Sequence, residues 1–317
     1  MIINAGARTD IVQYFTPWLI KRFEEGWVLV RHPWYPEKIT KYILDPKVVD
    51  CVEFCSKNYK PILKDLHKIT DRFNTHFQYT ITAYGKDVEP NVPSIDESME
   101  TLYELEKIVG AKRICWRYDP ILYTNNYDFE THKKTFDYIA SKISKHVDRC
   151  IFSFVDMYKK LEYNMPELIP LKYEDKDKLA SMLGETAKKY DLRIQTCGNA
   201  GDYSKYGING SACMTLKMIG EANDVVFKDR KHKGMREGCH CIESRDIGAY
   251  DSCINGCRYC YANANSKKAI ENYKLHDENS PLIIGNLMET DIIQDATQVS
   301  YLAKGVLKGE MKIDLGT

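Results

Sequence analysis

The chain has 317 residues, of which 45 are basic and 45 acidic, so its formal net charge is zero. A balanced charge does not indicate a nucleic-acid or membrane-surface partner, and this length suits either two domains or one α/β barrel with a large apolar core. The first residues lack the pattern of a secretory signal, and no apolar run approaches the length of a membrane span. We therefore expect a cytoplasmic protein without a membrane partner.

Short apolar runs alternate with helical patterns along the first 198 residues. Strands are predicted at 2–7, 49–58, 77–85, 112–120, 150–156 and 192–198, and the run at 27–33 indicates a strand or a hairpin arm. Helices are predicted at 16–26, 94–110, 129–147 and 174–190. Ser94 and Glu97 have the spacing of a capping box, and Gly110 marks the end of that helix. The alternation predicts an α/β fold, specifically a TIM-type β/α barrel.

The organisation of the chain follows from where this alternation stops. Residues 1–198 are predicted to form the barrel core, and residues 199–288 form a cysteine-rich region that completes it. Residues 289–317 are predicted to be a peripheral helical tail.

Polar side chains follow the predicted strands at their carboxyl ends, where β/α barrels place their active sites. We therefore predict catalytic roles for six of them and a cofactor-binding role for Asn58. The six are Arg8, Asp10, Lys57, Arg117, Asp119 and Asp156. Taken singly, each has a structural alternative: Arg117 and Asp119 suit an internal salt bridge, and Lys57 suits a solvated position. The recurrence at successive strand ends is what favours an active site.

The strongest chemical signal is the array formed by Cys253, Cys257 and Cys260, a CxxxCxxC spacing with Tyr259 before the last thiol. Three thiolates from one loop can hold three irons of a four-iron cluster and leave the fourth iron open. A zinc site is the alternative, because Cys239 or Cys241 could add a fourth ligand. Zinc ribbons usually use two CxxC pairs, so the single array favours iron and sulfur.

A second metal site is suggested by the cysteines outside that array. Cys239 and Cys241 form a CxC pair, Cys197 ends a predicted strand, and Cys213 is available as a fourth ligand. Four thiolates would close a second iron–sulfur cluster that leaves no iron open. Alternatively, Cys213 is a small buried apolar residue. Cys51, Cys55, Cys115 and Cys150 lie on strand patterns and are predicted to be core residues.

Several motifs together resemble one family of proteins of unknown function, over about residues 3 to 287. They are RTDI at 8–11, VLVRHP at 28–33, FCSKN at 54–58, WRYDP at 116–120, CHCIESRDIGAYDSC at 239–253, CRYCYAN at 257–263 and HDENSP at 276–281. In that family the C-terminal cysteine cluster is similar to the N-terminal cluster of radical S-adenosylmethionine enzymes.

The resemblance implies a 4Fe-4S cluster on Cys253, Cys257 and Cys260 and brings no known reaction. The CxxxCxxC spacing with an aromatic before the third cysteine is the one that radical S-adenosylmethionine enzymes use, so we predict S-adenosylmethionine as cofactor, with Tyr259 packed near the adenine. Reductive cleavage of this cofactor would need a cellular electron donor such as flavodoxin or ferredoxin. Two departures stand out. Cys55 and Ser56 occupy positions where the family more usually has Trp and Thr, and no glycine-glycine-glutamate segment is present to hold the amino group of the cofactor.

In radical enzymes the cluster loop follows the first strand, whereas here it lies near the end of the chain. A circular permutation would explain the difference, with residues 246–250 as the first barrel strand and residues 2–7 as its neighbour. This hypothesis requires the two segments to lie side by side.

Three functions compete at this point. The leading prediction is an enzyme that cleaves S-adenosylmethionine reductively and acts on an unknown substrate. The second is a nucleic-acid repair or modification protein, because the loop is similar to that of spore photoproduct lyase. The third is a protein without enzymatic activity, in which zinc or a closed cluster serves structure or electron transfer.

Overall fold

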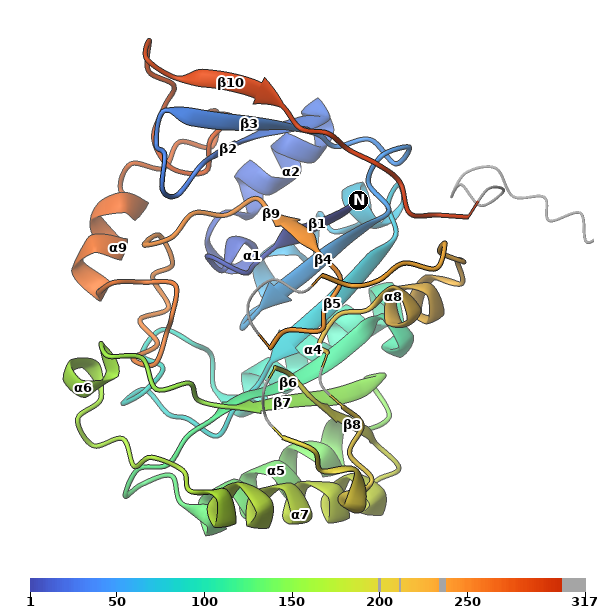
Figure 1. Cartoon of the computed structure of the whole chain (residues 1–317), viewed down its shortest axis with the longest axis vertical. Helices are drawn as coiled ribbons and strands as arrows, with labels where there is room; N and C mark the ends of the chain where they lie inside the picture. The colour runs from blue at the N-terminus through green and yellow to red at the C-terminus, as the bar shows by residue number, and fades with distance from the viewer. Residues whose placement is uncertain (199–200, 211, 234–237, 304–317) are drawn as a thin grey trace, which may run out of the picture.

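The computed structural model describes residues 1–198, 201–210, 212–233 and 238–303. A parallel sheet of seven strands forms its centre, in the order β8-β7-β6-β5-β4-β1-β9 (Figure 1). The strands are β1 (Ile2–Ala5), β4 (Cys51–Ser56), β5 (Thr75–Thr80), β6 (Ile114–Ile121), β7 (Arg149–Phe154), β8 (Arg193–Thr196) and β9 (Ser244–Asp246). The six strands predicted from the apolar runs are all present, and the mixed α/β fold is confirmed.

Helices connect the parallel strands, as βα units require. The longer ones are α2 (Thr16–Glu25), α4 (Ile95–Val109), α5 (Phe129–Ile143), α7 (Tyr173–Lys189), α8 (Leu216–Asn223) and α9 (Ser266–Tyr273). The short helices are α1 (Ile11–Tyr14), α3 (His67–Thr70) and α6 (Leu161–Asn164). The capping box of Ser94 and Glu97 forms as predicted, and Gly110 ends α4.

The two faces of the sheet differ in polarity. On the face covered by helices, Trp116 of β6 stacks on Phe136 of α5 with ring centroids 4.8 Å apart, and Phe77 of β5 lies in the same core. The alternate residues point to the inner face, where Gln78 donates to Glu53 at 2.5 Å. Strand β5 therefore has an apolar face toward the helices and a polar face on the opposite side.

The predicted closed barrel is not found, because within the described ranges β8 and β9 do not pair and the sheet stays open. The segment between them partly fills the gap. Asn209 exchanges backbone hydrogen bonds with Ile194 and Thr196 of β8, and Met214 accepts one from Ile242, just before β9. Glycines interrupt this segment, which weakens a continuous strand at the position where closure needs one.

Strand β9 pairs in parallel with β1, with Ser244 opposite Ile2 and Asp246 opposite Asn4. The adjacency that the permutation hypothesis requires is therefore present. The strand covers residues 244–246, earlier than the predicted 246–250, because the chain turns away after Asp246.

A second, smaller sheet joins an early segment of the chain to a late one, in the strand order β10-β3-β2. Strand β2 (Trp27–Arg31) pairs antiparallel with β3 (Lys38–Ile43), which confirms the hairpin alternative, and β10 (Ile292–Asp295) pairs parallel with β3. Figure 1 shows this sheet at one end of the molecule and α5 and α7 at the other. The predicted helical tail is corrected here: within residues 289–303 the structure has β10 and no helix, and residues 304–317 lie outside the described ranges.

Candidate functional site

The loop that follows β9 carries the three cysteines of the CxxxCxxC array; we call residues 247–265 the three-thiol loop. Its start is fixed to the tip of β1 by Asp246, whose carboxylate accepts from the backbone N–H groups of Ala7 at 2.8 Å and Gly248 at 2.9 Å. Gly256 adopts a φ of 71° between two of the cysteines, a left-handed conformation that favours glycine. The loop therefore lies at the carboxyl end of the parallel strands, the end predicted for an active site.

Asp10 joins the tips of β1 and β4 to this loop. Its buried carboxylate accepts from Ser56 Oγ at 2.6 Å, the Lys57 backbone N–H at 2.9 Å and Asn255 Nδ2 at 3.2 Å. Burial raises the pKa of Asp10, and these hydrogen bonds oppose the increase. Asp10, which the sequence analysis assigned to the site, thus holds Asn255 of the loop and the end of β4 in place.

Two of the three thiols accept hydrogen bonds from backbone N–H groups, and neighbouring charges act on the third. The backbone N–H groups of Asn255 and Asp10 donate to Cys253, and that of Ala262 donates to Cys260 Sγ at 3.3 Å. Burial raises the pKa of Cys253 to about 12, and burial and then Glu89 raise that of Cys257, with contributions from Cys253 and Cys260. The N–H donors favour the thiolate form that a metal requires, whereas burial favours the protonated thiol, so metal binding here would release protons.

Glu89 is a site residue that the sequence analysis missed. Its Oε1 accepts from Lys57 Nζ at 2.9 Å and Thr82 Oγ1 at 2.9 Å, and also from the Tyr259 hydroxyl. The Lys57 ammonium lies 5.7 Å from the centre of the Tyr259 ring. Burial works against a charge on Lys57, but Glu89 and then Cys257 raise its pKa. A buried cation and a buried carboxylate therefore stand beside the three-thiol loop.

Arg8 also reaches this region. Its Nε lies 3.6 Å from Asp246 Oδ1 and its guanidinium lies 5.4 Å from the ring of Tyr250, while 23% of the side chain is exposed. Arg8 is thus the partly exposed cation at the start of the loop.

The other predicted strand-tip residues have different surroundings. Arg117 pairs with Asp119, so the structural alternative of an internal salt bridge is observed, and Ser153 donates to the same carboxylate. Asn58 Oδ1 accepts from the Lys60 backbone N–H at 3.0 Å within its own turn. Asp156 is exposed, with the Tyr158 hydroxyl at 3.3 Å. None of these contacts joins Asn58 or Asp156 to the three-thiol loop.

The remaining predicted ligands come together from separate segments; we call Cys197, Cys213, Cys239 and Cys241 the four-thiol group. Cys213 Sγ lies 3.3 Å from Cys241 Sγ, which also accepts from the Cys213 backbone N–H at 3.2 Å. Thiol hydrogen bonds further join Cys197 to both of these residues, and Cys239 to Cys241. The structure therefore gathers the four cysteines that the sequence analysis grouped.

Charge reaches the four-thiol group from Arg117 on the inner face of the sheet. Hydrogen bonds from Cys197 and Cys241, together with the Arg117 guanidinium, lower the pKa of Cys213 well below 9. The same thiol contacts raise the pKa of Cys241. Gln78 Nε2 donates to the Cys213 carbonyl at 3.1 Å and so anchors the group to β5.

Beneath this group lies a buried polar chain that the sequence analysis also missed. His76 Nδ1 lies 2.8 Å from Glu53 Oε2, and His76 Nε2 lies 3.3 Å from Cys115 Sγ. All three side chains are fully enclosed. The inward position of Glu53 within the apolar run of β4 was the available signal, because a charge there needs a buried partner.

Across residues 1–198, 201–210, 212–233 and 238–303, no group of three or more His, Cys, Asp or Glu side chains is placed to hold a single metal ion. The ligands of a four-iron cluster bind different irons at different corners, so they do not converge on one point. The thiols of the three-thiol loop fit such a cluster in number and donor type.

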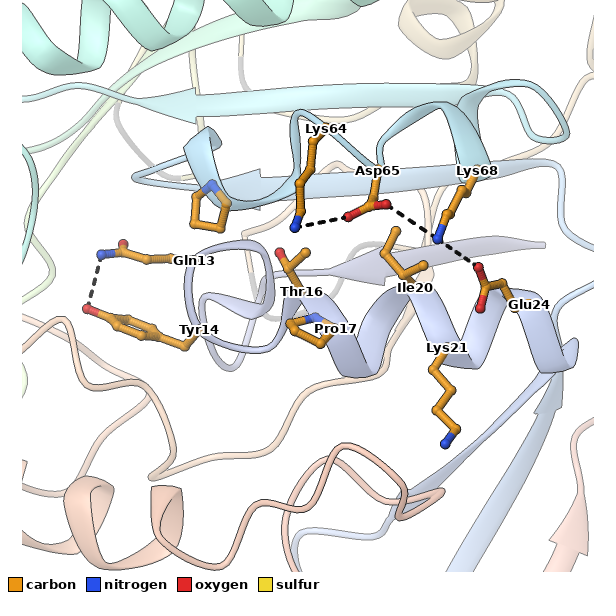
Figure 2. A pocket seen from close by; sticks show the side chains of 11 residues that line it. Gln13, Tyr14, Thr16, Pro17, Ile20, Lys21, Glu24, Lys64, Asp65 and Lys68 are labelled. Atoms are coloured by element: carbon orange, nitrogen blue, oxygen red, sulfur yellow. Dashed lines mark hydrogen bonds and ion pairs between the residues drawn. The ribbon is translucent and has the colours of Figure 1, made fainter.

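A surface groove opens between helices α1 and α2 on one side and residues 61–68 on the other (Figure 2). Its lining includes three lysines and two acids, and Lys68 Nζ lies 3.0 Å from Glu24 and 3.3 Å from Asp65, so the groove is not strongly basic. Tyr14 lines one end, and its hydroxyl donates to Asn255 Oδ1 of the three-thiol loop at 3.0 Å. Among the described residues, no helix combines the length and apolar character needed to cross a membrane.

A family model described as "Domain of unknown function (DUF1848)" matches residues 2–262, which include the large sheet, the three-thiol loop up to Ala262 and the four-thiol group. A search of curated proteins found no match to the sequence.

Proposed function

We propose that this chain, which belongs to the DUF1848 family of domains of unknown function, is an iron–sulfur enzyme that starts radical chemistry from S-adenosylmethionine. The observation that carries the proposal is the position of Cys253, Cys257 and Cys260. They lie in a loop that leaves the carboxyl end of β9 and is hydrogen-bonded to the tips of β1 and β4. When bound there, a 4Fe-4S cluster supplies an open iron and the electron that cleaves the carbon–sulfur bond of the cofactor.

The residues around the loop have roles that suit this chemistry. The backbone N–H groups of Asp10 and Asn255 stabilise the thiolate of Cys253, and Asp10 keeps both groups in place through its own hydrogen bonds. Lys57 puts a positive charge near Cys257, which favours the added electron of a reduced centre. Glu89 holds Lys57 in that position and prevents an unpaired buried charge.

Arg8 is the group we assign to a carboxylate of the cofactor or substrate. Its guanidinium is partly exposed and lies beside the loop, and it is only loosely paired with Asp246, at 3.6 Å. A planar guanidinium binds carboxylates through two hydrogen bonds. The packing of Tyr259 against adenine stays a prediction. The hydroxyl of this tyrosine donates to Glu89, so only its ring is available for such packing.

The test is electron paramagnetic resonance of anaerobically purified, dithionite-reduced protein with and without S-adenosylmethionine. We expect a reduced-cluster signal that shifts when the cofactor is added. The Cys257→Ala variant should lack the signal, and Cys150→Ala, a buried cysteine of β7, should retain it.

Two other results would contradict the proposal. A cluster signal that ignores the cofactor would indicate electron transfer, and zinc without iron would indicate a structural site. A nucleic-acid substrate, the alternative taken from spore photoproduct lyase, would be supported by a strongly basic groove, and the groove of Figure 2 pairs its Lys68 with Glu24 and Asp65.

A further inference from the structure

We infer that the four-thiol group binds one zinc ion in a closed tetrahedral site, and not a second iron–sulfur cluster. This ion would join the two open edges of the large sheet. The inference is independent of the chemistry proposed for the three-thiol loop.

The distance between the sulfurs distinguishes the two kinds of site. Sulfurs that surround one zinc ion lie about 3.8 Å apart, the edge of a tetrahedron whose centre is about 2.3 Å from each corner. Cys213 Sγ and Cys241 Sγ lie 3.3 Å apart. They must separate by roughly half an ångström to admit the ion, which side-chain rotation can supply. This contact explains why the side chains as placed do not surround a metal position.

A four-iron cluster needs a much larger rearrangement. Each of its cysteines binds a different iron, so no two of the sulfurs can remain in contact. Here Cys241 is hydrogen-bonded to three other thiols, those of Cys197, Cys213 and Cys239. A set in which one sulfur contacts all the others suits a single central ion.

The surroundings of the group are those of a structural site. Ile2, Ile219 and Ile242 pack around the buried Cys241 and exclude water from it. Four thiolates around a divalent ion leave a net negative charge, which the nearby Arg117 guanidinium opposes. Because four ligands complete the tetrahedron, the site leaves no position open for a substrate.

The position of the four-thiol group in the fold indicates a structural role for the ion. Cys197 directly follows β8, and Cys241 comes shortly before β9, and these are the strands at the two edges of the sheet. Cys213 belongs to the segment between them. A single ion would therefore tie both edges to the intervening segment and replace the hydrogen bonds that close a complete barrel.

The experiment is metal analysis of the full chain, purified anaerobically, by mass spectrometry of zinc and iron. We expect about one zinc per native chain. The Cys241→Ser variant should contain no zinc and should keep its iron. Cys257→Ala should lose iron and retain zinc, and the matched control Cys150→Ala should retain both.

Cobalt provides a second measurement that does not depend on a variant. Protein from cells grown with Co²⁺ should show the intense visible absorption bands of a tetrahedral cobalt–thiolate complex. Added zinc should displace the cobalt and remove these bands. If Cys241→Ser does not fold, these bands in the native chain still test the site.

Three results would overturn the inference. They are loss of several irons in Cys241→Ser with no zinc in the native chain, absence of any metal besides the iron of the three-thiol loop, and a disulfide between Cys213 and Cys241. A failure of the proposed enzyme gives a different pattern, because it removes iron and leaves the zinc and cobalt results unchanged.

Discussion

The three-thiol loop and the four-thiol group use the same side chain in opposite ways. In the loop, Cys253 and Cys260 accept from backbone N–H groups, and the thiols affect one another through charge. In the four-thiol group the sulfurs contact one another directly. The number of ligands distinguishes the two proposed sites: three thiolates would leave one iron of a cluster open, whereas four would close a site around one ion.

The charges beside the two regions differ as well. Lys57 lies near the loop and is paired with the buried Glu89, while Arg117 lies near the four-thiol group and is paired with Asp119. Each thiol set thus has its own ion pair. Changes at one pair should affect one region and spare the other.

The largest expected effect is the loss of S-adenosylmethionine cleavage when a thiol of the three-thiol loop is removed. Cys257→Ala should reduce dithionite-dependent formation of 5′-deoxyadenosine from S-adenosylmethionine by at least about 100-fold, because this chemistry depends on the cofactor cluster. The measurement is product formation by chromatography, with Cys150→Ala as the matched control. Equal activity in Cys257→Ala and the native chain would contradict the assignment of the loop.

A second change tests the ion pair of the loop. Lys57→Met leaves the Glu89 carboxylate buried without its cation and should lower the free energy of unfolding by about 3 kcal/mol. Combining it with Glu89→Gln should recover part of that loss, because the double variant buries no unpaired charge. Urea unfolding of the native chain, both single variants and the double variant measures the coupling. Additive losses would show that the pair contributes nothing of its own.

Much of the fold was predictable because it depends on local patterns. Apolar runs of strand length located six strands, and the capping box located the start of α4. The open sheet was not predictable, because closure depends on pairing between segments far apart in the chain. The strand β10 was mistaken for helix because its support comes from β3, about 250 residues earlier.

The candidate site was predictable where chemistry limits the choice of residue. Cysteine spacing identified both thiol sets, although nothing in the spacing told that Cys213 and Cys241 would be in contact. Glu89 was missed because it lies in a loop well beyond the end of β5. The sequence analysis looked for site residues only directly after the predicted strands. His76 was missed because a buried histidine has no signal apart from its partners Glu53 and Cys115.

The smallest expected effect concerns this histidine, beneath the four-thiol group. Burial disfavours a charge on His76, but Glu53 and then Cys115 raise its pKa well above 6.5. A proton that the folded state retains and the unfolded state releases stabilises the fold below pH 6.5, and this contribution is lost as the pH rises through the folded pKa.

The native chain should therefore lose stability as the pH rises above about 6.5, with a slope from this group of up to about 1.4 kcal/mol per pH unit, and His76→Gln should remove that slope. His132 is the matched control, because burial lowers its pKa to about 4. His132→Gln should alter the pH dependence only between about 4 and 6.5, where the unfolded state binds the additional proton. Urea unfolding from pH 5 to 9 distinguishes the two. An unchanged slope above pH 6.5 in His76→Gln would mean that His76 is not charged in the folded chain above that pH, in spite of its contact with Glu53.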